Sequence, residues 1–158
     1  MKTLPFVCLI VGFAATTWAI PQTVGPTGNF GAGRNFEQFA GDRATWSPSA
    51  ALPGAWSPPA ADGGRTLTDH AVIFGLPAAE VHAEQSNDRL IRLRVVFRDS
   101  GKDRRTLFTR VSQGIAAFTG HPAREEGRET KVFRFEQTQI RATPAKEGEV
   151  VVEFTPAP

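Results

Sequence analysis

Cysteine is almost absent from this chain, which has a single cysteine, Cys8, among 158 residues. Cys8 lies in an apolar run near the N-terminus that we expect to be removed on export. The mature chain would then contain no thiol, and it could form no disulfide, no thiolate metal site and no cysteine nucleophile. We therefore expect a packed hydrophobic core to provide its stability.

The sequence also lacks the motifs of common catalytic and cofactor-binding sites. It has no Gly-x-Ser-x-Gly elbow, no phosphate-binding glycine loop, no His-Glu-x-x-His and no calcium-binding loop. GAGR at positions 31–34 has neither the preceding apolar strand nor the third glycine of a dinucleotide motif. The histidines His70, His82 and His121 share no metal-ligand spacing. These absences favour a protein that is not an enzyme and that holds no cofactor and no metal.

Carboxylates are not placed as general acid–base catalysis requires. Such catalysis needs a buried pair of carboxyl groups whose pKa values are driven apart, and the pattern shows no such pair. Strand alternation instead predicts exposure for the glutamates at 80, 84, 136, 149 and 153. We therefore interpret the acids as solvated surface groups.

The N-terminal segment has the layout of a secretory signal peptide. Lys2 precedes an apolar run over residues 4–15, and small residues follow at Thr17 and Ala19. The run is shorter than the roughly 20 apolar residues that span a bilayer as a helix. We predict a signal peptide over residues 1–19 and a secreted or periplasmic mature protein without a transmembrane segment. An uncleaved N-terminal anchor is the alternative.

Residues 20–68 have the composition of a linker. They are rich in Gly, Pro, Ala, Ser and Thr, and they show neither a strand-like nor a helix-like periodicity. Two features differ from a plain linker: a short helical turn is expected around Phe36 and Phe39, and a Trp-Ser-Pro sequence occurs at both Trp46 and Trp56. Two interpretations remain open. The segment is a flexible stalk, or its indoles dock onto the following domain or onto a partner.

Residues 69–155 have the pattern of an α+β domain, and residues 156–158 form a tail. Alternating apolar positions predict strands within residues 71–85, 89–99, 131–142 and 149–154. One helix is expected between the second and third of these strands. The predicted fold is a small ββαββ two-layer module, in which a mostly antiparallel sheet is covered on one face by the helix.

The helix is predicted from apolar residues spaced by three and four, which are Leu107, Val111, Ile115 and Phe118. We expect this stripe to face the inner side chains of strand 89–99. Asp103 is expected to cap the first turn through its carboxylate, and Gly120 is expected to end the helix in a left-handed conformation.

The first two strands are predicted to form a hairpin with a loop at residues 86–88. On the inner side, Val81 would face Leu93 and Ala83 would face Ile91. On the outer side, Glu80 would face Arg94 and His82 would face Arg92. Apolar residues then meet apolar residues and an acid meets a base, as expected of a correct register.

A row of arginines, Arg92, Arg94 and Arg98, stands on the outer side of this hairpin, and Arg134 would join it if the third strand were adjacent. In the predicted register Glu80 neutralises Arg94, whereas Arg92 and Arg98 have no acidic cross-strand partner. We interpret the row as a solvated, partly paired sheet face. The alternative is a surface that binds an anion or a partner.

Taken as a sequence, the chain favours a secreted or periplasmic, non-catalytic binding or interaction module. Its partner would be an unidentified protein or an anionic envelope polymer. Two alternatives remain open: a polyanion-binding module that uses the arginine face, and an accessory or pro-segment-like domain of a secreted hydrolase. We expect no nucleic acid, because exposed aromatic residues do not alternate with the basic ones.

Overall fold

The computed structural model describes residues 34–99, 101, 103–145 and 148–158. The predicted signal peptide at 1–19 and the first part of the 20–68 segment lie outside the described residues. The strands are β1 (Gly64–Thr66), β2 (Val72–Ile73), β3 (Leu76–Pro77), β4 (Glu80–Ser86), β5 (Arg89–Arg98), β6 (Arg124–Glu126), β7 (Thr130–Phe135), β8 (Thr138–Pro144) and β9 (Glu149–Pro156). The helices are α1 (Phe36–Gly41), the 3-10 turn η1 (Arg43–Trp46) and α2 (Arg104–Thr119).

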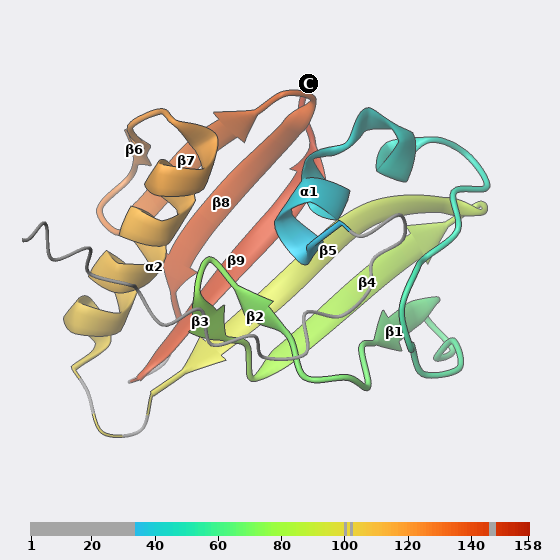
Figure 1. Cartoon of the computed structure of the whole chain (residues 1–158), viewed down its shortest axis with the longest axis horizontal. Coiled ribbons are helices and arrows are strands. Elements are labelled where there is room, and N and C mark those ends of the chain that lie inside the picture. The colour runs from blue at the N-terminus through green and yellow to red at the C-terminus, as the bar shows by residue number, and fades with distance from the viewer. Residues whose placement is uncertain (1–33, 100, 102, 146–147) are drawn as a thin grey trace, which may run out of the picture.

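The described residues form a 7-stranded sheet in the order β1-β4-β5-β9-β8-β7-β6, in which every pair is antiparallel. Helices α1 and α2 and the small β2–β3 hairpin lie on one face of this sheet (Figure 1). The core lies between these layers, because alternate strand residues are buried against the helices. The predicted α+β class, with a mostly antiparallel sheet and one main helix, is confirmed.

One predicted strand is in fact a hairpin. Residues 131–142, expected as one continuous strand, divide into β7 and β8, which pair directly through Phe135 and Thr138. The chain reverses at Glu136, whose φ is 51°, in the left-handed region. The turn contains neither glycine nor proline, so the sequence carries no turn signal there.

Helix α2 has the predicted buried stripe but a different neighbour. Leu107, Val111 and Ile115 are buried, and Phe118 is half-buried. The helix packs mainly over β7, β8 and β9, and not mainly over strand 89–99 as expected. Gly120 ends the helix as predicted, with φ of 70°.

The start of α2 differs from the expected cap. Asp103 stands at the N-cap position, but its carboxylate accepts no capping hydrogen bond. Its backbone carbonyl accepts from the N–H groups of Thr106 and Leu107 instead. The first turn of α2 is therefore closed by the backbone rather than by the Asp103 side chain.

The β4–β5 hairpin forms in a register two residues away from the predicted one. Val81 faces Val95 and Ala83 faces Leu93. A bulge accounts for one residue of this shift, and the other comes from a turn that is one residue shorter than expected. Its residues, Asn87 and Asp88, both have positive φ, at 49° and 57°.

A β-bulge close to the turn changes which side chains of β5 point into the core. The register shifts between Glu84 and Gln85, so Glu84 faces Arg92 and Gln85 faces Leu90. Leu90 is consequently buried, whereas Ile91 is 43% exposed. The expected inward position of Ile91 is wrong.

The segment before β1 contains ordered structure that packs against the sheet. Helix α1 begins with a capping box between Asn35 and Gln38. Phe36 and Phe39 are buried on this helix, as the short helical turn expected around them requires. The Phe36 ring meets Phe154 of β9 edge to face, with ring centroids 5.5 Å apart.

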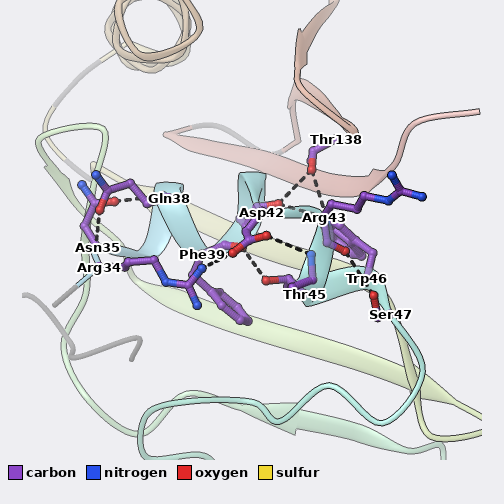
Figure 2. A network of polar contacts seen from close by, with 12 residues as sticks. Arg34, Asn35, Gln38, Phe39, Asp42, Arg43, Thr45, Trp46, Ser47 and Thr138 are labelled. Carbon is purple, nitrogen blue, oxygen red and sulfur yellow. Dashed lines mark hydrogen bonds and ion pairs between the residues drawn. The ribbon is translucent and has the colours of Figure 1, made fainter. Parts of the chain in front are cut away.

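Trp46 is docked on the sheet and is only 4% exposed. Its indole Nε1 donates to the Ala40 carbonyl at 3.1 Å and to the Thr138 Oγ1 at 2.9 Å, and the Thr138 hydroxyl donates to the same carbonyl at 2.9 Å (Figure 2). The Trp46 carbonyl also accepts from Arg89 Nε at 2.8 Å. Residues 40–46 are thus fixed to both β8 and β5.

Trp56 lies half-buried beside β1. Its indole N–H donates to the Pro53 carbonyl at 2.9 Å, and its backbone forms an isolated bridge with Leu67. Trp46 thus has the docked arrangement of the two interpretations left open above, whereas these contacts of Trp56 lie within its own segment. Neighbouring backbone bonds, from Ser57 N–H to the Thr66 carbonyl and from Thr68 N–H to the Ala55 carbonyl, cover the edge of β1.

Candidate functional site: the outer face of the sheet

The side of the sheet opposite to α1, α2 and the β2–β3 hairpin is called the outer face here. Strand alternation sends Leu93, Val95 and Phe97 of β5 into the core, so the intervening residues point the other way. Residues paired across an antiparallel ladder share a face. On this basis the outer face carries the arginines at 92, 94, 98, 124, 134 and 141 and the glutamates at 80, 84, 126, 149 and 153.

Arg92 is held between two glutamates. Its Nε and one terminal nitrogen donate to Glu84 Oε2 at 3.1 and 2.9 Å, and the other terminal nitrogen donates to Glu153 Oε1 at 3.2 Å. These bonds raise the pKa of Arg92, with the bonds to Glu84 as the largest cause. The guanidinium is therefore fixed along β4, β5 and β9.

Arg98 is held in the same way at the far end of β5. It contacts Glu80 Oε1 at 2.6 Å and Glu149 Oε2 at 3.1 Å. Glu80 also accepts from His82, and the hydrogen bonds from His82 and then Arg98 hold the pKa of Glu80 below its usual range. Val96 is buried on this side of β5, separate from the main core.

The predicted charge pairing is therefore wrong in detail. Glu80 was expected opposite Arg94, but the register places it opposite Val96 and within reach of Arg98. Arg92 and Arg98, expected to lack acidic partners, each have two. Among the described residues, Arg94 forms no ion pair.

Among the remaining charged residues of the outer face, the glutamate is again paired and two arginines are not. Glu126 contacts Arg141 at 3.0 Å, so each glutamate on the face contacts a cationic side chain. Arg124 and Arg134 have no ion pair within the described part of the chain. Arg134 lies on β7, which β9 and β8 separate from β5, so it does not join the row on β5 directly. The unsatisfied charge on this face is positive.

A groove of about 420 Å³ lies on the outer face above β5, β9 and β8. Arg94 lines it together with Arg92 and Arg141. Its acidic lining residues, Glu84 and Glu153, both bind Arg92. Arg94 is thus the arginine of the groove whose guanidinium donors have no partner in the described structure.

Two of these arginines were not found by sequence reasoning. Arg124 lies on β6, which was not predicted, and Arg141 was placed on a strand whose hairpin turn was missed. The alternation of Thr130, Val132 and Arg134 could have placed β7 on this face. The edge strand β6, which pairs with β7 on the side away from β8, has no signal in the sequence.

A buried carboxyl group, also unexpected, lies on the opposite side of the molecule. Glu37 of α1 is 6% exposed. Its Oε1 accepts from the Phe74 N–H, while its Oε2 is buried without a hydrogen-bond partner. Burial raises the pKa of Glu37. A single such group is not the pair that acid–base catalysis uses.

Within the described ranges, no cluster of His, Cys, Asp and Glu side chains has the geometry to hold a metal ion. The helices described there include none that is both long and apolar enough to cross a membrane. No protein-family model, no curated protein and no solved structure matches the chain.

Proposed function

We propose that this chain is a secreted or periplasmic, non-catalytic binding protein, and that it engages its partner through the outer face of the sheet. The observation that supports this is the charge balance of the face. Every outer-face glutamate has a cationic partner, whereas Arg94, Arg124 and Arg134 have no anionic one in the described part of the chain. A partner with anionic groups would complete the pairing.

The scaffold around Arg94 suits a binding role. The backbone at Arg94 is held in the sheet because β5 pairs with β4 on one side and β9 on the other, and Arg92 and Arg98 on either side of Arg94 are each paired with two glutamates. The guanidinium of Arg94 presents donors in a planar fork that matches a carboxylate or another oxyanion. The site is therefore preorganised around one unpaired cation.

The location outside the cytoplasm is supported by the layout of residues 1–19. In that compartment, the candidate partners are an acidic protein and an anionic envelope polymer. Nucleic acid is not proposed, since the exposed arginines have no exposed aromatic residues beside them in the described structure.

The test compares two variants with the same loss of charge. The first is Arg94→Gln/Arg124→Gln/Arg134→Gln on the outer face. The control is Arg43→Gln/Arg105→Gln/Arg110→Gln, which changes exposed arginines on η1 and α2. Each mature protein is incubated with envelope and secreted material of the source cells, and the retained fraction is measured at increasing salt.

We expect the outer-face variant to lose at least tenfold in retention and the control to keep it. Retention of the wild type should also fall as salt rises, because the pairing is electrostatic. Equal retention of both variants would show that the outer face is only a solvated surface, and the proposed function would be wrong.

A further inference from the structure

We propose that the partner is a folded protein with separated surface carboxylates, one of which binds Arg94 in the groove. This inference rests on the function proposed above, and it names the chemistry of the partner. The possible occupants of the face differ in how well their charges match the unpaired arginines.

The N-terminal segment of the chain does not have the required groups. Residues 1–33 contain no aspartate and no glutamate, so this segment has no side-chain carboxylate for Arg94. A second copy that used the same face would also be a poor match. Its outer-face glutamates are already paired with Arg92, Arg98 and Arg141. Two such faces would bring unpaired arginines together.

A dense polyanion matches the face poorly as well. Glu153 lies directly opposite both Arg94 and Arg141, in one row across β5, β9 and β8. A polymer with closely spaced charges that follows this row would place an anionic group over Glu153, which costs free energy by like-charge repulsion. The groove contains Glu84 in addition.

The unpaired arginines are also far apart. Arg94 shares a row with Arg124, through Glu153, Arg141 and Val132, so β9, β8 and β7 separate the two. Four strand spacings of about 4.8 Å make this distance about 19 Å. Arg134 lies near Arg124, displaced along β7 from Val132. The face therefore presents one cation in the groove and two near the β6 edge.

A folded protein can meet this arrangement, because its carboxylates are held at fixed positions with neutral or basic groups between them. A carboxylate that enters the groove can accept two parallel bonds from the Arg94 fork. A second acidic site would lie over Arg124 and Arg134. The glutamates between them would then face neutral or basic residues of the partner, which gives specificity as well as attraction.

The experiment uses Arg94→Lys, which keeps the charge and introduces an amine. The mature variant is mixed with envelope and secreted proteins of the source cells, and a carbodiimide then couples amines to carboxylates in direct contact. Arg105→Lys on α2 is the matched control. We expect an amide bond between the amine introduced at position 94 and an aspartate or glutamate of a partner protein, identified by peptide mapping, and none from position 105.

Two competitors complete the test, heparin and poly-L-glutamate. We expect neither polymer to displace the partner, even when the concentration of its anionic groups is tenfold above the concentration of the partner. We also expect Arg94→Gln to lower the retention of the partner at least tenfold. Capture of a protein without a bond at position 94 would overturn the inference. So would tight binding of heparin or poly-L-glutamate that depends on the outer-face arginines, although the proposed binding function would then stand. Loss of that function itself is detected by the paired glutamine variants above.

Discussion

The contact between Trp46 and Thr138 tests whether the segment before β1 folds together with the sheet. The two residues are 92 positions apart in sequence, and both bind the carbonyl of Ala40 at the end of α1 (Figure 2). Thr138 is 0% exposed. The pair therefore joins α1, η1 and β8 at one buried point, and its loss should be measurable in the stability of the whole fold.

The expected magnitude follows from what each substitution leaves behind. Thr138→Val keeps the volume but removes the hydroxyl, and the indole and the Ala40 carbonyl still bind each other at 3.1 Å. No buried group loses every partner, so the cost should be about 1–2 kcal/mol. Trp46→Phe removes the N–H and leaves a partly empty site, at a cost of about 2–3 kcal/mol.

The assay is a double-mutant cycle in urea, followed by far-UV circular dichroism because one variant lacks the indole. We expect the double variant to be more stable than the sum of the single losses predicts, with a coupling of about 1 kcal/mol. A coupling within about 0.3 kcal/mol of zero, or single losses below about 0.5 kcal/mol, would refute the reasoning. It would mean that residues 42–47 do not fold with the sheet.

Three further predictions concern the core, the buried acid and metals. Phe118→Ala should cost about 2 kcal/mol in urea unfolding, because the half-buried ring packs on Phe135 with centroids 4.4 Å apart and on Phe74; a loss below about 1 kcal/mol would contradict this. Glu37 has a raised pKa in the folded state, so its contribution to the unfolding free energy should be largest below the usual value of 4.5 and should fall as pH rises through the folded pKa. Glu37→Gln should abolish this fall in urea titrations at several pH values, and parallel profiles of the two proteins would refute it. A chelator should leave the melting temperature unchanged, whereas a drop of several degrees that zinc reverses would reveal a metal site.

Local signals in the sequence were sufficient for α2 and insufficient for the β7–β8 hairpin. The stripe of Leu107, Val111 and Ile115 has helical spacing, and Gly120 provides the left-handed stop, so the helix could be predicted within its bounds. The turn at Glu136 has a left-handed conformation without glycine or asparagine. The pairing of β7 with β8 imposes that conformation, and the turn propensities of its residues do not predict it.

Strand alternation alone could not predict which arginines of the candidate site are paired. Alternation alone points Arg92, Arg94 and Arg98 in one direction. Which of them is paired depends on the hairpin register, and the register depends on the tight turn at Asn87 and a bulge beside Glu84. A shift of two residues was enough to exchange the paired and unpaired arginines.

The amino-acid composition of the segment before β1 did not predict that the segment packs against the sheet. It is rich in Pro, Gly and Ala, yet Phe36, Phe39 and Trp46 are buried in it. A few large apolar side chains, each placed over the sheet, are enough to dock a segment that has little regular structure of its own.

The central position of β9 has a consequence for the time course of synthesis. This strand lies between β5 and β8 and forms the hydrogen-bonded connection between β1-β4-β5 and β8-β7-β6 (Figure 1). A ribosome completes both of these groups before it reaches residues 149–156. Any sheet fragment that forms from β1-β4-β5 or from β8-β7-β6 before β9 is available exposes a strand edge that another chain could pair with. Pairing of β9 with both β5 and β8 removes these two edges together, so a chain without β9 in place is the form that is open to edge-to-edge association.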